Sequence, residues 1–66
     1  MEIVLNGELM TIAEGCSLAQ LLESLHIPTS GTAVACNDAV VRKANYAETV
    51  LKPGDRVEII RAVAGG

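Results

Sequence analysis

Two short apolar runs flank an Asn-Gly pair in Glu2-Ile3-Val4-Leu5-Asn6-Gly7-Glu8-Leu9-Met10-Thr11-Ile12-Ala13. Asn-Gly is the strongest short-range hairpin signal, because both residues accept the positive φ angles that a two-residue turn requires. The pattern therefore predicts an antiparallel pair of strands over residues 2–5 and 8–13.

A helix is predicted directly after this hairpin. Glu14-Gly15 turns the chain, and Ser17 with Gln20 three residues later has the spacing of a capping box at a helix start. The leucines that follow recur at helical spacing and form one apolar stripe. These residues are Leu18, Leu21, Leu22 and Leu25. We expect Pro28 to stop the helix.

The second half of the chain alternates loops with apolar runs. Pro28 to Thr32 has loop composition, and Ala33 to Cys36 is predicted to be a third strand. Asn37-Asp38 suggests a turn into a very short strand at Val40-Val41. The segment from Lys43 to Val50 is ambiguous. It is compatible with one helical turn around Tyr46, the only aromatic residue of the chain, which would then plug the core.

The last apolar run, Val57 to Arg61, is predicted to be a strand that begins after a type II turn in residues 51–55. One helix stripe packed on one face of a mixed sheet buries these apolar sets economically. We therefore expect an α+β fold of the β-grasp type, with four to five strands packed on one helix. Its first and last strands would pair in parallel at the sheet centre. Residues 1–61 would form this single domain, and residues 62–66 a flexible tail.

Length and composition exclude several classes of function. A chain of 66 residues makes one small domain, and large catalytic pockets are not expected at this size. The net charge of −3 and the scattered basic residues do not fit a nucleic-acid binder. Neither a signal peptide nor a membrane-spanning run is recognisable, so we expect a cytoplasmic protein.

The cysteines and the histidine show no metal-site spacing. Cys16 and Cys36 are interpreted as reduced thiols that act as small hydrophobes, and the alternative is a sulfur relay or a disulfide. His26 is the only histidine, and we place it near the helix end. No metal site is predicted.

The tail reads Ala62-Val63-Ala64-Gly65-Gly66 and follows the last predicted strand without a linker. Glycine has no Cβ, so two glycines form a thin probe that fits a narrow cleft. The α-carboxylate of Gly66 is ionised at neutral pH and can attack the α-phosphorus of ATP. The resulting acyl adenylate has an unhindered carbonyl carbon, open to sulfide, persulfide, thiol or amine. The tail is therefore a candidate carrier of an activated acyl group.

Six stretches of the chain form a recognisable series: residues 1–7, 17–22, 34–37, 40–42, 51–57 and 62–66. They read MEIVLNG, SLAQLL, VACN, VVR, LKPGDRV and AVAGG. In this order they match the landmarks of the ubiquitin-like ThiS family, the sulfur carriers that serve thiazole formation in thiamine biosynthesis, and the resemblance covers the whole chain.

The resemblance implies a carrier that is a protein co-substrate and not an enzyme. A ThiF-like adenylating enzyme would use ATP and Mg²⁺ to adenylate Gly66, and this chain itself would bind no cofactor. Sulfur from a cysteine desulfurase would then replace AMP, and the thiocarboxylate would serve thiazole synthase. Gly66 would be the modified residue. Gly65, Ala64, Val63 and Ala62 would enter the partner, with Val63 docking in an apolar slot.

Three alternatives remain open at this point. The small subunit of molybdopterin synthase has similar Gly-Gly chemistry but is commonly longer. A ubiquitin-like modifier would form an amide between Gly66 and lysines of other proteins. A non-covalent β-grasp interaction domain would not need Gly65-Gly66 for binding.

Overall fold

In the computed structural model, which describes residues 1–61, five strands form one mixed sheet in the order β2-β1-β5-β3-β4. The elements in chain order are β1 (Glu2–Leu5), β2 (Glu8–Thr11), α1 (Leu18–Ser24), β3 (Thr32–Cys36), β4 (Ala39–Val41), η1 (Lys43–Glu48) and β5 (Arg56–Arg61). The predicted α+β architecture is confirmed. The parallel pairing of the first and last strands is also confirmed, with β5 at the centre of the sheet.

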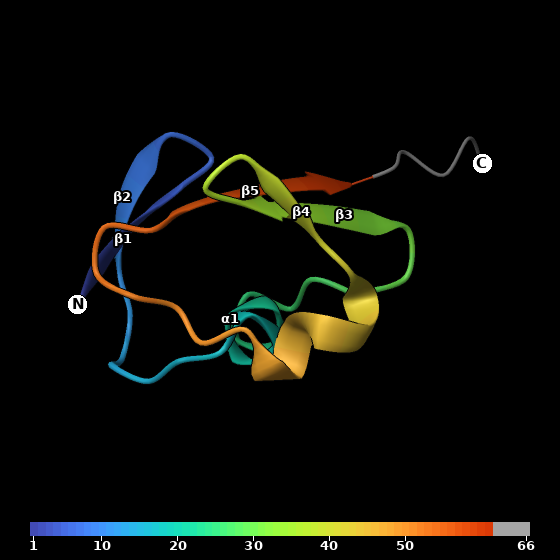
Figure 1. Ribbon diagram of the computed structural model, residues 1–66, viewed down its shortest axis with the longest axis horizontal. Helices are drawn as coiled ribbons and strands as arrows, with labels where there is room; N and C mark the ends of the chain where they lie inside the picture. Colours follow the sequence, from blue (N-terminus) through green and yellow to red (C-terminus); the bar gives the residue numbers. More distant parts are fainter. Residues whose placement is uncertain (62–66) are drawn as a thin grey trace.

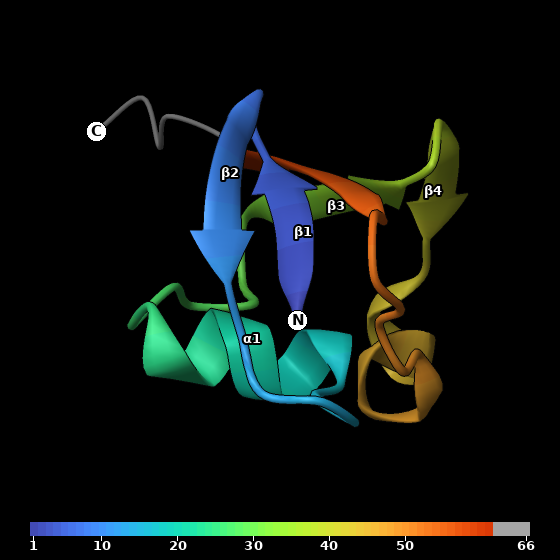
Figure 2. The same ribbon diagram turned by 90° about the vertical axis from the view of Figure 1, so that its left-hand side faces the viewer.

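The sheet lies on one side of the molecule, and α1 and the 3-10 helix η1 lie together on the other (Figure 1). Turned by 90°, the β1–β2 hairpin runs at a steep angle to β3 and β5, so the sheet is strongly twisted (Figure 2). The pairing of β1 with β5 covers Val4–Arg56 and Leu5–Val57 and stops there, because β1 ends at Leu5 and the chain turns at Asn6 and Gly7.

The hairpin at the start of the chain has the predicted turn. Asn6 and Gly7 both have positive φ, 49° and 84°, as a type I′ turn requires. The predicted second strand extends two residues too far, since β2 ends at Thr11. Ile12 still exchanges backbone hydrogen bonds with Met1 and is buried, and the chain then leaves the sheet toward the turn at Gly15.

Helix α1 begins at the predicted cap. The Gln20 backbone nitrogen donates to Ser17 Oγ at 3.1 Å, and the Ser17 backbone nitrogen donates to Gln20 Oε1 at 2.9 Å. The helix ends at Ser24, earlier than a stop at Pro28 suggests. It ends there because His26 adopts a left-handed φ of 57° and reverses the chain two residues before the proline.

The ambiguous segment forms the predicted helical turn, as the 3-10 helix η1. Tyr46 on this turn is only 4% exposed, so its role as a core plug is confirmed. Two backbone hydrogen bonds join the end of this segment to the start of α1. Leu18 N donates to the Thr49 carbonyl at 2.8 Å, and Leu51 N donates to the Cys16 carbonyl at 2.9 Å.

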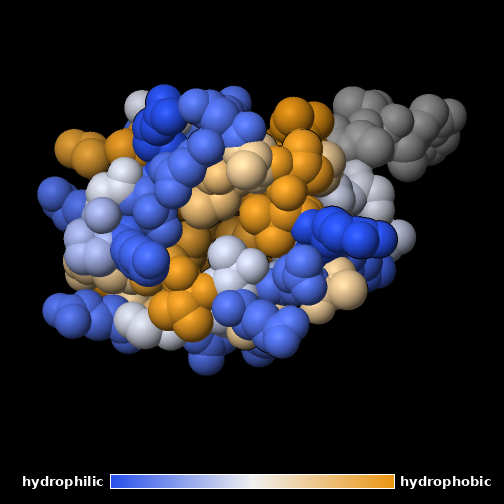
Figure 3. All heavy atoms as spheres, in the orientation of Figure 1, coloured by the Kyte–Doolittle hydropathy of each residue, from blue (hydrophilic) through white to orange (hydrophobic). Residues whose placement is uncertain are grey.

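The core lies between the sheet and the two helices. Its buried hydrophobic residues are Ile3, Ile12, Leu18, Leu21, Leu22, Val34, Tyr46, Leu51, Val57 and Ile59. In the space-filling view, hydrophobic residues gather along the seam between sheet and helices, whereas the lower, helical side is largely hydrophilic (Figure 3). Burial of this hydrophobic set supplies most of the favourable free energy of folding.

The chain enters β5 through the predicted type II turn. Asp55 N donates to the Lys52 carbonyl at 3.1 Å, and Gly54 between them has a φ of 83°. The Asp55 carboxylate also accepts from Lys52 N at 2.8 Å, which fixes the turn. Within residues 1–61, no helix is both long and apolar enough to cross a membrane.

Candidate functional site

The candidate site is the tail that follows β5, and the structure describes the platform from which it starts. Ala62, Val63, Ala64, Gly65 and Gly66 lie outside the described residues, as does the predicted flexibility of this segment. The last described residue, Arg61, belongs to the central strand of the sheet. The tail therefore follows directly on the strand at the centre of the sheet.

One edge of β5 is held by β3. The two strands pair in antiparallel register from Cys36–Val57 to Thr32–Arg61, so β3 accompanies β5 to its last described residue. The other edge pairs with β1 only as far as Leu5–Val57. The second half of β5 therefore pairs with a neighbouring strand on one edge only.

The Asn6 side chain binds β5 on the edge where its pairing with β1 has ended. Its side-chain oxygen Oδ1 accepts a hydrogen bond from Ile59 N at 2.8 Å, and Nδ2 donates to the Ile59 carbonyl at 3.4 Å. The sequence pattern predicts only a hairpin turn at Asn6. An Asn-Gly turn signal does not say what the asparagine side chain reaches, because its partner here lies 53 residues away in sequence.

A second asparagine holds the other end of β5. Asn37, at a positive φ of 51° in the turn between β3 and β4, accepts from Arg56 N at 2.9 Å through Oδ1. Its backbone nitrogen donates to the Arg56 carbonyl at 2.7 Å. The two turns thus hold β5 at opposite ends and from opposite edges.

The face of the sheet away from the helices carries exposed hydrophobic residues. Leu9, Val40 and Ile60 are 73%, 80% and 64% exposed. By strand alternation and register, Ile60 lies beside Ala33, and Val40 beside Ala35, on this face. Ile60 lies one residue before Arg61, so this exposed aliphatic face reaches the end of the described chain.

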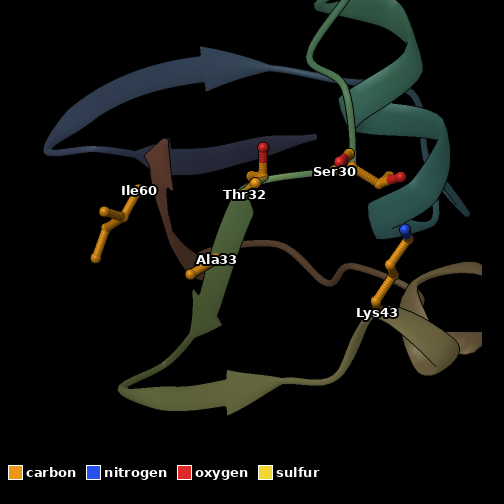
Figure 4. A pocket seen from close by; sticks show the side chains of 7 residues that line it. Ser30, Thr32, Ala33, Lys43 and Ile60 are labelled. Atoms are coloured by element: carbon orange, nitrogen blue, oxygen red, sulfur yellow. The ribbon is translucent and has the colours of Figure 1, made fainter. Parts of the chain in front are cut away.

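A shallow hollow lies beside Ile60, between the loop before β3 and the start of η1 (Figure 4). Its lining includes Ser30, Thr32, Ala33, Lys43 and Ile60. Lys43 reaches toward the loop that carries Ser30, while Ile60 projects from β5 at the far side (Figure 4). The hollow offers one cation, hydroxyl groups and an aliphatic wall, without the paired acid and base that a catalytic centre needs.

The two cysteines are free thiols, both of intermediate exposure. The Cys16 thiol donates to the Ser17 carbonyl at 3.4 Å. Burial, with a further contribution from the Asp55 carboxylate, raises the pKa of the Cys36 thiol above its ordinary value of 9.0. A raised pKa lowers the thiolate fraction at neutral pH, which is opposite to what a reactive sulfur relay requires. Cys36 is therefore suited to packing.

Charged groups in the described part of the chain are dispersed. Residues 1–61 contain no cluster of three or more histidine, cysteine, aspartate or glutamate side chains that could hold a metal ion. The Arg56–Asp38 pair at 2.8 Å is exposed on both sides, and pairs of this kind contribute little to stability. His26 is exposed beyond the end of α1.

Comparison with protein families and relatives covers the whole chain. Residues 3–66 match the model described as the ThiS family. The chain is 32% identical to the sulfur carrier protein ThiS of Escherichia coli K12, and the match covers all of both chains. It is also 32% identical to part of a thiazole synthase of Paramagnetospirillum magneticum, of whose length it spans 20%.

Solved structures give the same picture. The crystal structure of a thiamine biosynthesis protein, ThiS, from Geobacter metallireducens superposes with a TM-score of 0.85 at 29% identity, over all of both chains. A solution structure of a thiamine biosynthesis protein from the same organism gives a TM-score of 0.83 at 29% identity. That match covers all of this chain and 88% of the other. The β-grasp prediction is thereby confirmed.

Proposed function

This chain belongs to the ThiS family and is a sulfur carrier of thiamine biosynthesis, and we propose that it carries the sulfur as a thiocarboxylate on Gly66. The observation that carries the proposal is the extent of the match. The family model runs from residue 3 through the terminal Gly65-Gly66, and the whole length of a curated sulfur carrier aligns with this chain.

The proposed reaction begins at the Gly66 carboxylate. A carboxylate oxygen attacks the α-phosphorus of ATP, pyrophosphate leaves, and an acyl adenylate forms. The terminal sulfur of a desulfurase persulfide then attacks the carbonyl carbon, AMP leaves, and an acyl disulfide forms. A thiol such as cysteine attacks the other sulfur of this acyl disulfide, so that a disulfide leaves and a thiocarboxylate remains on Gly66. Glycine at this position leaves the carbonyl carbon accessible.

We assign the activation step to a ThiF-like adenylating enzyme. Phosphoryl chemistry requires Mg²⁺ and cationic groups around the phosphates, whereas this chain has a net charge of −3. The carrier supplies the carboxylate and a slim approach to it. In this role it is a carrier and not a catalyst, and ATP and Mg²⁺ belong to the partner.

We assign the receiving step to thiazole synthase. The support is the match between this chain and one fifth of a protein named thiazole synthase. A carrier-like segment within such a protein is consistent with work at a common site, because covalent linkage raises the effective concentration of two partners. Val63, with Ala62 and Ala64 on either side, would seat the tail in an apolar slot of each partner.

Intact mass and peptide fragmentation test the proposal. The carrier is incubated with ATP, Mg²⁺, cysteine, a desulfurase and the adenylating enzyme, and the C-terminal peptide is then fragmented. Fragmentation is needed because exchange of oxygen for sulfur and oxidation of Met1, Met10 or a cysteine give nearly equal gains in mass.

Sulfur located on Gly66, and absent from a variant that lacks Gly66, is the expected result. An unmodified tail, with an adenylating enzyme that is active on another carrier, would contradict the proposal. Amide-linked conjugates on lysines of other proteins would instead indicate a modifier. Partner binding that survives deletion of Gly65-Gly66 would indicate a non-covalent interaction domain.

A further inference from the structure

The contact between Asn6 and Ile59 replaces a missing strand residue. The β1–β5 ladder continues to the bond from Asn6 N to the Val57 carbonyl, 2.9 Å long, and there the chain turns away at the positive φ of Asn6. Ile59 is the next residue of β5 that faces this edge, because residues alternate along a strand. The Asn6 carboxamide forms hydrogen bonds with both the backbone N–H and the carbonyl of Ile59, as the backbone of a continuing strand would.

The position of this contact connects it with the tail. Ile59 is two residues before Arg61, the last described residue, and its side chain is 8% exposed and part of the core. The hydrogen bonds therefore fix the backbone direction of β5 at the last core residue before the tail. Beyond Leu5, the Asn6 side chain bonds the backbone of β5 on this edge, whereas β3 bonds it on the other edge.

We propose that Asn6 is a positioning residue for the acyl-carrier tail, which it acts on through Ile59 and the end of β5. This inference rests on the proposed function, since it assumes that the partner enzyme takes up the tail and the domain together. Pre-organisation lowers the cost of binding, because a segment that already has its bound direction loses less freedom in the complex. Asn6 never touches the reacting atoms.

The prediction concerns binding more than chemistry. If the end of β5 frays, the partner must order it before the tail can enter, so KM for the carrier should rise. Once the tail is seated, the Gly66 carboxylate meets the same catalytic groups, and kcat should stay close to that of the unmodified carrier.

The chain offers a matched pair of variants. Asn6→Gly removes the carboxamide and retains a Gly-Gly turn that tolerates positive φ. Asn37→Gly makes the same change at the same sign of φ. It removes the hydrogen bond that Asn37 accepts from Arg56 N and the one that it donates to Asp55 Oδ1, both at the far end of β5. A general loss of stability would affect both variants, whereas positioning of the tail depends only on Asn6.

A third variant tests the chemistry of the contact. In Asn6→Asp the carboxylate can still accept from Ile59 N, but it places a second negative oxygen opposite the Ile59 carbonyl. Its effect should therefore lie between those of the unmodified carrier and Asn6→Gly. It also serves as the test variant if Asn6→Gly fails to fold.

The experiment measures steady-state adenylation, by pyrophosphate exchange, as a function of carrier concentration for the unmodified chain and the three variants. We expect Asn6→Gly to raise KM about fivefold to tenfold, because the partner must order a strand end that has lost one or two hydrogen bonds. Asn37→Gly should leave KM within about twofold of the unmodified carrier. Amide hydrogen exchange on the free proteins should show faster exchange at Ile59, with little change at Val57, only in the Asn6 variants.

Three results would overturn the inference, and they differ from failure of the proposed function. An unchanged KM in folded Asn6→Gly would show that the contact does not position the tail. An equal rise in KM for Asn37→Gly would reduce the effect to general stability, and unchanged exchange at Ile59 would show that the contact does not hold β5. No adenylation of the unmodified carrier by a competent enzyme would instead remove the proposed function, and this inference with it.

Discussion

The backbone nitrogen of Ile27 donates to the carbonyl oxygen of Leu22 across 2.9 Å and closes the end of α1. His26 N donates to the Glu23 carbonyl at 3.0 Å, and the two bonds together form a Schellman motif. The motif needs a left-handed residue between helix and loop, a position that glycine occupies most often. Here it is His26, with a φ of 57°.

His26→Gly should stabilise the protein. The left-handed conformation costs a residue with a Cβ about 1–2 kcal/mol, and glycine avoids this cost. Glycine also increases the conformational entropy of the unfolded chain, which offsets part of the stabilisation. We expect a net gain of about 0.5–1 kcal/mol and a melting temperature several degrees higher, measured by thermal circular dichroism. His26→Ala keeps the Cβ and serves as control. A melting temperature for His26→Gly equal to that of His26→Ala would contradict the strain argument.

Ser17→Ala should destabilise the protein through loss of the capping box. Ser17 is 8% exposed and its hydroxyl accepts from Gln20 N, so the substitution leaves a helix N–H without this partner. The expected cost is about 1 kcal/mol, within the range of about 0.5–2 kcal/mol for N-cap losses. Urea unfolding measures it. Ser24→Ala, at an exposed hydroxyl in the last turn of α1, is the matched control and should stay within about 0.5 kcal/mol of the unmodified protein.

Tyr46 should behave as a packing residue. Tyr46→Ala leaves a cavity among α1, η1 and the sheet, and truncation of a large aromatic side chain costs about 3–5 kcal/mol. A domain of this size has little more stability than that, so much of the variant should be unfolded at 37 °C. Tyr46→Phe keeps the ring and should retain most of the stability. If Tyr46→Phe proved as damaging as Tyr46→Ala in urea unfolding, the hydroxyl and not the ring would be the important group.

Cys36 should lower the free energy of unfolding at alkaline pH. Because burial and Asp55 raise the pKa of its thiol, the unfolded chain releases this proton at a lower pH than the native protein does. The Cys36 thiol therefore does not lower the free energy of unfolding below the ordinary thiol pKa of 9.0. As the pH rises above this value, the free energy of unfolding falls. Urea unfolding from about pH 8 to pH 10 should show a shallower decline for Cys36→Ala than for the unmodified protein. Cys16→Ala is the control, and an equally shallow decline there would contradict the assignment.

Val63→Asp should impair activation of the tail. Val63 is proposed to enter an apolar slot of the adenylating enzyme, and a carboxylate buried there without a partner is costly. We expect kcat/KM for adenylation to fall about tenfold or more, and Val63→Ala, which stays apolar, to lose less. Pyrophosphate exchange measures both variants, with thermal melts as a check on folding. Undiminished adenylation of Val63→Asp would rule out the apolar slot.

Local chemistry explains why most of the fold could be predicted. The Asn6-Gly7 turn, the Ser17–Gln20 capping box and the turn around Gly54 are decided by neighbouring residues, and each forms as expected. The end of α1 was placed too late because a histidine in the left-handed position leaves no glycine signal. Pro28 is the conspicuous residue there, yet the reversal has already occurred at His26.

The long-range contacts could not be predicted in the same way. Asn6 meets Ile59 because the chain turns away from β5 at Asn6 while β5 continues to Arg61, and no short sequence pattern says which distant residue the Asn6 side chain reaches. Likewise, alternation alone does not show that Leu9, Val40 and Ile60 stay uncovered, since exposure depends on where the helices lie. The chemical nature of the tail, in contrast, was readable because it depends on residue type.

The central position of β5 also bears on how the chain folds during synthesis. β5 is the last of the five strands to leave the ribosome, and β1 and β3 reach each other only through it. Until it emerges, the nascent chain lacks the strand that joins the β1–β2 pair to the β3–β4 pair. Non-local pairing of this kind delays folding until distant segments can meet. Chains whose synthesis stops before residue 56 should therefore remain unfolded and be degraded by proteases. Incomplete carriers would then be removed before they compete for the activating enzyme.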